Sequence, residues 1–178
     1  IELHLDALRK LGAEIREEDG VLYCCTPNGL RGCELHLPFP SVGATENIML
    51  AASRASGVTR IRNAAREPEI EDLARFLECM GVSVRGAGTS VIEVECVQKT
   101  KAPIFRVMPD RIVAATYLIG VAMTGGEALI TDLVPEQIAP ITSLLQSSGC
   151  RVLCEKDRVF LKSNGKLHPF QTIRTMPY

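Results

Sequence analysis

Apolar and polar positions alternate with two different periods along this chain, and the period changes at three glycines. Around residues 3–11 the apolar positions share one side of a predicted helix. Gly12 ends this pattern, and a strand-like alternation follows it. The same change recurs at Gly81 and Gly149, so that the glycines are 69 and 68 residues apart.

A second feature keeps the same period. Ser41 and Asp110 are both candidates for the residue that begins a helix, and they are also 69 residues apart. A fixed period over this length indicates duplicated structural units. Since the period is longer than a solenoid repeat, we expect each unit to be a small α+β module.

One period is predicted to contain six elements. Helices are expected near 3–11, 42–55, 68–80, 111–123 and 135–147, and strands near 14–17, 21–26, 33–37, 59–63, 82–85, 91–95, 105–108 and 128–131, with a last hairpin over 151–161. A period therefore reads strand, helix, strand, helix, strand, strand. In such a βαβαββ unit two helices pack on one face of a four-stranded sheet, and a sister unit covers the other face or leaves it exposed.

The clearest interruption of the pattern is polar and lies at 96–103. We place a domain boundary just after it, near 108–110. The expected parts are 1–108 and 109–178, so that the chain contains about two and a half units, the second part being incomplete.

Charge and hydropathy exclude two classes of partner. Lys and Arg number 20 and Asp and Glu 21, so the chain has no basic field of the kind that general nucleic-acid binding needs. The longest apolar stretch, 112–123, is shorter than the roughly 20 residues of a membrane span, and no signal peptide is recognisable. We expect no nucleic acid, no membrane and a cytoplasmic location.

The seven cysteines form no CxxC pair, and their number is odd. A disulfide scaffold would use an even number in a smaller chain, so reduced and mostly buried thiols are expected. Cys150 and Cys154 have the spacing nearest to that of a metal pair, but on a strand they are too far apart to share one ion. No metal is expected.

The strongest local signal for binding is the segment 39–47. Ser41 is a good N-cap, and Gly43 lies in the first helical turn. A helix start has unpaired N–H groups and a partial positive charge, which suit an anion. An ordinary capped helix has the same signature. At the matching start, the carboxylate of Asp110 would fill this position and repel a phosphate, so we expect the two starts to differ in function.

Other candidates are weaker. Arg66, in a loop before a helix, pairs within the structure or contacts a substrate. The glycines of 85–89 join two strands instead of opening a helix, which indicates a hairpin and not a phosphate loop. The three histidines are scattered, and only His4 is a candidate to face a cleft. No nucleophile or acid–base pair is identified.

Four motifs in this order make a family resemblance specific. They are PSVGATENIM at 40–49, NAAREPEI at 63–70, RGAGT at 85–89 and PDRI at 109–112. Together they resemble the UDP-N-acetylglucosamine 1-carboxyvinyltransferases over essentially all 178 residues. The resemblance implies the enolpyruvyl transferase fold, an inside-out α/β barrel of the EPSP synthase type, with three βαβαββ units in each of two domains.

The resemblance also implies a reaction. The family moves the enolpyruvyl group of phosphoenolpyruvate to the 3′-hydroxyl of UDP-N-acetylglucosamine, the first committed step of bacterial peptidoglycan synthesis, which serves cell shape and division. It needs no cofactor. The partners are therefore these two small molecules.

Only part of the family's sequence is matched. The mobile loop with the catalytic cysteine and the Lys-Asn pair that meets phosphoenolpyruvate belong to the family's front part, and the aspartate base follows the matched region. None of the cysteines here takes the catalytic position. We therefore expect no catalytic residue in this chain and no activity of the isolated chain.

What the resemblance does carry over is part of the UDP-sugar site. Glu2 and Leu3 match the end of a segment that contacts uridine, with Glu2 in place of the usual aspartate. Ser41, Val42 and Gly43 match the diphosphate-binding helix start. Phe39 stands where some members have lysine. Arg111 lies at the interdomain crossing as a further cleft candidate.

Two alternatives remain open at this point. One is 3-phosphoshikimate 1-carboxyvinyltransferase, an enzyme of the same fold; the other is a noncatalytic scaffold or binding protein that kept the repeats. We also expect each sheet to leave apolar surface uncovered, which favours self-association.

Overall fold

The computed structural model divides the chain into two units, Ile1–Arg106 and Val107–Thr175. The structure describes residues 1–96, 102–169 and 172–175. Most of the polar interruption at 96–103, and the last three residues of the chain, lie outside the described residues.

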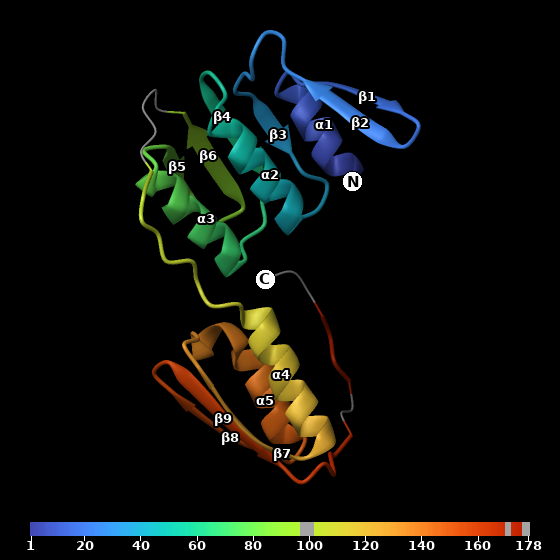
Figure 1. The fold of residues 1–178 in the computed structure, drawn as a ribbon, viewed down its shortest axis with the longest axis vertical. Helices are drawn as coiled ribbons and strands as arrows, with labels where there is room; N and C mark the ends of the chain where they lie inside the picture. Colours follow the sequence, from blue (N-terminus) through green and yellow to red (C-terminus); the bar gives the residue numbers. More distant parts are fainter. Residues whose placement is uncertain (97–101, 170–171, 176–178) are drawn as a thin grey trace. The chain divides into compact units, whose positions relative to one another are not determined.

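The first unit begins with the end of one repeat and continues with a complete one. The incomplete repeat consists of helix α1 (Glu2–Lys10) and the hairpin of β1 (Glu14–Glu18) and β2 (Val21–Cys25). The complete repeat contains β3 (Glu34–His36), α2 (Val42–Ala52), β4 (Val58–Arg62), α3 (Pro68–Cys79), β5 (Ser83–Arg85) and β6 (Val91–Glu95). This is the predicted βαβαββ order (Figure 1).

The four strands of the complete repeat form one sheet in the order β3-β4-β6-β5. Strands β3 and β4 are parallel, because α2 connects them as a crossover. The other two pairs are antiparallel, and the hairpin 85–89 joins β5 to β6 as predicted. Gly86 and Gly88 both have φ of 80°, a left-handed conformation that glycine adopts readily in a tight turn.

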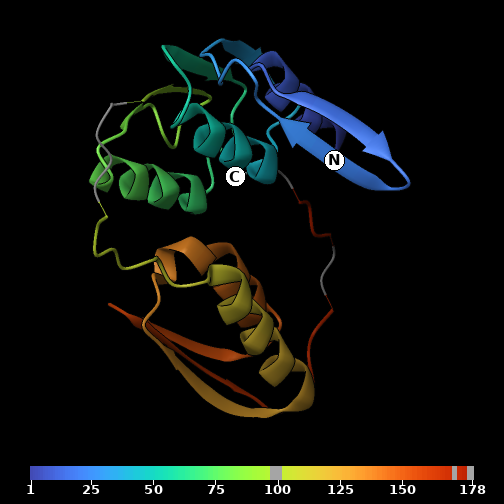
Figure 2. The same cartoon turned by 45° about the horizontal axis from the view of Figure 1, so that its top comes forward.

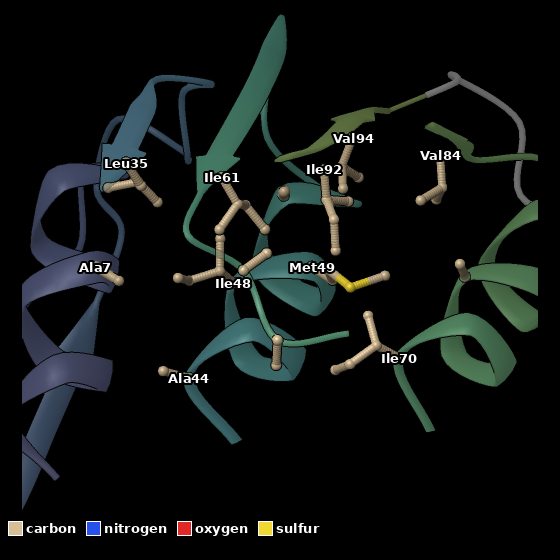
Figure 3. Close-up of a cluster of buried hydrophobic side chains, with 14 of the residues drawn as sticks. Ala7, Leu35, Ala44, Ile48, Met49, Ile61, Ile70, Val84, Ile92 and Val94 are labelled. Carbon is tan, nitrogen blue, oxygen red and sulfur yellow. The ribbon is translucent and has the colours of Figure 1, made fainter. Parts of the chain in front are cut away.

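The core of this unit lies between the sheet and helices α1, α2 and α3 (Figure 3). Alternate strand residues point inwards, among them Leu35, Ile61 and Ile92. They meet Ile48 and Met49 of α2, which are fully buried. Burying each such side chain contributes about 1.5–3 kcal/mol to folding. Helix α2 is central to this core because it packs against both α1 and α3 as well as against the sheet.

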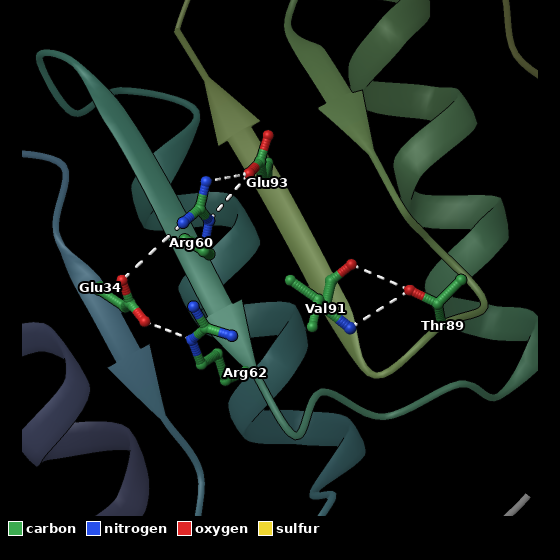
Figure 4. A network of polar contacts seen from close by, with 6 residues as sticks. All are labelled: Glu34, Arg60, Arg62, Thr89, Val91 and Glu93. Carbon is green, nitrogen blue, oxygen red and sulfur yellow. Dashed lines mark hydrogen bonds and ion pairs between the residues drawn. The ribbon is translucent and has the colours of Figure 1, made fainter.

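The opposite face of the sheet carries charges in place of the expected apolar surface (Figure 4). Arg60 contacts the Glu93 carboxylate at 2.6 Å, and Arg62 pairs with Glu34. The Arg62 hydrogen bond and charge hold the pKa of Glu34 below its ordinary value. The prediction of an apolar sheet face is therefore wrong for this unit, because each strand places its charged residues on the outer face.

The second unit repeats the pattern without its first strand. It contains α4 (Arg111–Thr124), β7 (Gly126–Thr131), the 3₁₀ helix η1 (Pro135–Ile138), α5 (Ala139–Ser147), β8 (Arg151–Glu155) and β9 (Arg158–Ser163). The strands form an antiparallel sheet in the order β7-β9-β8, which matches β4-β6-β5 of the first unit. Its core contains Leu118, Leu145 and Leu161.

Two predicted elements of this region differ in the structure. Residues 105–108 have no regular secondary structure, although a strand was predicted there. A strand at 105–108 would pair with the free edge of β7. That edge instead borders a groove of about 550 Å³, whose lining includes Val113, Tyr117 and Ile130. The predicted helix 135–147 is split into η1 and α5, because Pro140 has no N–H and its ring disturbs the preceding turn.

The repeat itself is confirmed in backbone geometry. Gly12, Gly81 and Gly149 follow α1, α3 and α5 with φ of 106°, 97° and 96°. Asn63 and Asp132, also 69 residues apart, share the left-handed conformation with φ of 56° and 57°. Such a conformation is uncommon for residues other than glycine, so the shared geometry supports duplicated units.

No helix in the described part of the chain has the length and apolar character that crossing a membrane requires. Nor do three or more possible metal ligands gather anywhere among the described side chains.

Candidate functional site

Three helix starts lie at one edge of the first unit. Helices α1, α2 and α3 lie side by side on the sheet and run in the same direction (Figures 1 and 2). Each start has N–H groups without an intrahelical acceptor and a partial positive charge. Backbone N–H groups at this edge can therefore hold an anion.

The start of α2 is capped in a way that leaves two N–H groups available. Ser41 is the N-cap, and its Oγ accepts from the Ala44 N–H at 3.3 Å. Ser41 also accepts through its carbonyl from the N–H of Thr45, at 3.0 Å. Among the described residues, no acceptor is found for the N–H groups of Val42 and Gly43. The predicted anion position is thus open.

His4 lies directly beside this helix start. A Cβ atom built on Gly43 would be 3.2 Å from Cε1 of His4 and 3.7 Å from its Nε2. On the same ring, Nδ1 is 2.6 Å from Nδ2 of Asn47. The absence of a side chain at Gly43 therefore gives room to the imidazole, which the sequence did not indicate.

The loop before α3 is hydrogen-bonded to the first turn of α2. Thr45 is fully buried, and its Oγ1 accepts from the Ala65 N–H at 3.1 Å. The next residue, Arg66, is exposed, and its N–H donates to Glu67 Oε2 at 2.9 Å. Arg66 is thus held near the edge by its backbone, while its side chain extends towards solvent.

A carboxyl group of α2, that of Glu46, has a shifted pKa. Burial, and then the nearby Glu69 carboxylate, raise the pKa of Glu46 above its ordinary value. The charged form of Glu46 is disfavoured here, because a partly buried carboxylate loses hydration and meets a like charge.

The remaining predicted residues of this site differ in their environments. Glu2 and Leu3 lie with His4 in the first turn of α1; Leu3 packs against the core, and Glu2 contacts Arg9 at 3.4 Å. Phe39, two residues before the cap, exposes 56% of its surface. An exposed ring in place of a lysine supplies apolar surface but no positive charge.

The matching start of α4 is closed. Asp110 Oδ1 accepts from the N–H groups of Ile112 and Val113 at 2.9 and 3.0 Å. The prediction that this carboxylate fills the helix start is confirmed. Arg111 follows it, half-buried, in the second unit, so the structure does not assign it to the edge that contains His4 and Ser41.

The sequence did not indicate that Asn47 contacts His4, although Asn47 lies within the motif 40–49. The available signal was its spacing from Gly43: residues four apart lie on the same face of a helix. His4, which no motif assigned, could only be placed by tertiary structure.

The repeats define a class: an α/β protein built from duplicated βαβαββ units, in which the helix start at Ser41 is open and the matching start at Asp110 is closed. A family model described as EPSP synthase (3-phosphoshikimate 1-carboxyvinyltransferase) matches residues 1–178, and the chain belongs to this family.

Its curated relatives carry a more particular name. The chain is 47% identical over its whole length to UDP-N-acetylglucosamine 1-carboxyvinyltransferase 2 of Caldanaerobacter subterraneus subsp. tengcongensis, of which it covers 42%. It is 42% identical over its whole length to UDP-N-acetylglucosamine 1-carboxyvinyltransferase 1 of Carboxydothermus hydrogenoformans, again covering 42%. The chain thus spans less than half the length of these relatives.

Solved structures show the same fold. The enolpyruvyl transferase NikO from Streptomyces tendae aligns with a TM-score of 0.81 and 22% identity, covering 94% of this chain and 43% of that one. An EPSP synthase from Acinetobacter baumannii aligns with a TM-score of 0.65 and 22% identity, over 93% and 39%. The expected enolpyruvyl transferase fold is confirmed.

Proposed function

We propose that this chain forms part of an enzyme that transfers the enolpyruvyl group of phosphoenolpyruvate to UDP-N-acetylglucosamine. The observation that carries the proposal is the similarity at 42–47% identity, over the whole chain, to relatives named for that reaction. In this reading the enzyme works in the cytoplasm of a bacterium, in peptidoglycan synthesis. Residues 1–108 belong to its first domain, and 109–178 begin its second.

The proposed role of the first unit is to hold the nucleotide diphosphate. The N–H groups of Val42 and Gly43 face the anion, with Ser41 shaping the turn. Glu2, Leu3 and Phe39 lie on the nucleotide side. Arg66, and Arg111 of the second unit, are proposed to face the cleft of the complete enzyme.

The chemistry requires an acid for the methylene carbon, a base for the sugar hydroxyl and stabilisation of the intermediate's charge. This chain is proposed to supply scaffold and diphosphate anchoring only. Consistent with that role, burial raises the pKa of Cys33, the reverse of what a nucleophilic thiol needs.

A ligand titration tests the proposal against the enzyme that the family model's description names. We expect UDP-N-acetylglucosamine to shift the amide NMR signals of residues 41–45 in the 178-residue chain, and shikimate 3-phosphate to leave them unchanged. The reverse preference would favour the 3-phosphoshikimate enzyme. A response to neither ligand would favour a noncatalytic scaffold.

Self-association is part of the proposal. Helix α4 exposes Ile112, Tyr117 and Met123 to 59%, 67% and 66%, which is unusual for an apolar helix. We expect sedimentation velocity to show dimers or larger species at micromolar concentration. Tyr117→Lys should reduce them, and a strictly monomeric chain would contradict this expectation.

A further inference from the structure

The sheet of the second unit has an outer face that no helix of the unit covers. Helices α4 and α5 lie on its other face, where Val159 and Leu161 are buried (Figure 1). Since side chains alternate along a strand, every second residue of β7, β9 and β8 points away from the helices. These residues form three rows across the strands, Glu127–Lys162–Arg151, Leu129–Phe160–Leu153 and Thr131–Arg158–Glu155.

The middle row, Leu129, Phe160 and Leu153, is apolar and open to solvent. Leu129 exposes 54% of its surface and Leu153 exposes 47%, and Phe160 between them is partly exposed. Side chains directly opposite each other on neighbouring strands are about 4.5–5.5 Å apart, so the apolar row is one continuous strip. A strip of this kind between two polar rows has the composition of a protein–protein contact, with an apolar centre and a polar rim.

The first unit supplies an internal comparison for the apolar row. Its strands β4, β6 and β5 are arranged like β7, β9 and β8, and the corresponding row is Arg60–Glu93–Arg85. Leu129 follows Arg60 by 69 residues, the period of the repeat. Since the sheet of the first unit forms with charges at all three positions, the fold does not require apolar residues there. The apolar row therefore points to a contact that the first unit does not make.

The charges beside the apolar row indicate what covers it. Lys162 pairs with Glu127 at 3.0 Å, and Arg158 pairs with Glu155 at 2.9 Å. Within the described parts of the chain, no carboxylate pairs with Arg151, at one corner of this face. A partner that brings an apolar strip with a carboxylate beside it would fit this face.

A second copy of the chain has both features. Sheets can stack face to face with nearly aligned strands, and two arrangements with two-fold symmetry superpose the apolar rows. With the axis along β9, Leu129 of one copy lies over Leu153 of the other, and Arg151 faces Glu127. With the axis along the apolar row, each leucine lies over its own equivalent, and Arg151 faces Glu155. In both arrangements Arg151 meets a carboxylate, twice in each dimer.

We propose that two copies of this chain associate through the outer faces of their second-unit sheets, with the apolar row at the centre and Arg151 as the ion-pairing residue of the rim. The inference does not depend on the proposed function, and it concerns the sheet face opposite to α4. Lys162 and Arg158 face cations of the other copy, but each is paired within its own chain, which limits the repulsion.

The size of the face sets the strength of the contact. Three strands at 4.8 Å spacing and about six residues long cover roughly 300 Å². A stable interface buries about 800 Å² on each partner. The dimer is therefore expected to be weak and reversible, and to form only at high concentration.

The first test gives the second unit the charged row of the first. Sedimentation velocity is measured up to millimolar concentration in a Tyr117→Lys chain, which disfavours association through α4. We expect this parent chain to dimerise with rising concentration, and Leu129→Arg/Phe160→Glu/Leu153→Arg in the same background to stay monomeric. Leu50→Arg, at an apolar residue of the first unit that is 46% exposed, is the matched control and should dimerise like the parent.

Two results would overturn the proposal: a parent chain that is monomeric at every concentration, or a folded triple variant that dimerises as the parent does. Circular dichroism checks the fold of each chain. If the triple variant does not fold, Leu153→Arg alone replaces it, with the same expected loss of dimer.

The second test uses charge reversal to identify the partner and the axis. Arg151→Glu should weaken self-association about tenfold, because like charges then meet at two places in the dimer. Mixed with a Glu127→Arg chain, it should form a heterodimer if the axis runs along β9. Mixed with a Glu155→Arg chain, it should do so if the axis runs along the apolar row. Unchanged self-association of Arg151→Glu, or pairing with neither chain, overturns the face-to-face contact of two copies.

Discussion

Gly43→Asp is expected to abolish detectable binding of UDP-N-acetylglucosamine to the 178-residue chain. The new carboxylate would lie in the first turn of α2, where its charge would repel the diphosphate and its bulk would occupy the space in front of the backbone N–H groups. At the N-cap of α4, Asp110 shows that a carboxylate can occupy a helix start in this fold, since it accepts from two N–H groups. The Cβ would also crowd His4, 3.2 Å away.

Affinity of the unsubstituted chain is expected to be on the order of 1 mM, about 4 kcal/mol of binding free energy. Gly43→Asn has nearly the same shape without the charge, so it separates crowding from repulsion. We expect Gly43→Asn to bind measurably and Gly43→Asp not at all, by NMR titration. Equal binding by the two variants, or ligand-induced shifts at 110–112 and none at 41–45, would show that the diphosphate does not rest on α2.

The second large effect is the absence of turnover. The 178-residue chain alone is expected to release no phosphate from UDP-N-acetylglucosamine and phosphoenolpyruvate. The family resemblance assigns the catalytic cysteine loop, the Lys-Asn pair and the aspartate base to segments beyond the matched region, and the chain covers only 42% of its relative from Caldanaerobacter. Anchoring a diphosphate without an acid or a base does not lower the barrier of the chemical steps.

Phosphate release measured beside the full-length Caldanaerobacter relative provides the comparison. The relative supplies the positive control, and the chain with each substrate omitted supplies the background. Turnover of the chain near that of the relative would mean that groups among the 178 residues perform the acid–base steps.

Much of the fold could be predicted because its signals are local. Gly12, Gly81 and Gly149 end helices by adopting positive φ, which a side chain would disfavour, and their spacing already indicated the repeat. The caps Ser41 and Asp110 act on N–H groups two or three residues away. Helix-ending glycines and N-caps each depend on a few consecutive residues, so the sequence of a short segment is enough to predict them.

Two of the three errors in the predicted fold occur where neighbours in space decide the outcome. Residues 105–108 have the composition of a strand, but a strand exists only when another strand pairs with it. The split of η1 from α5 is the one local error, because Pro140 by itself disfavours an uninterrupted helix there. The charged outer face in Figure 4 depends on how Glu34, Arg60 and Glu93 align across three strands.

The repeat, the order of most elements and the contrast between an open helix start at Ser41 and a closed one at Asp110 follow from local sequence, because capping and helix termination depend on a few neighbouring residues. The meeting of His4 with Gly43 and Asn47 depends on tertiary structure. The contact between His4 and Asn47 joins residues 43 positions apart. It exists because α1 and α2 pack in parallel on one sheet face, and packing depends on buried surfaces from the whole unit and not on any single segment.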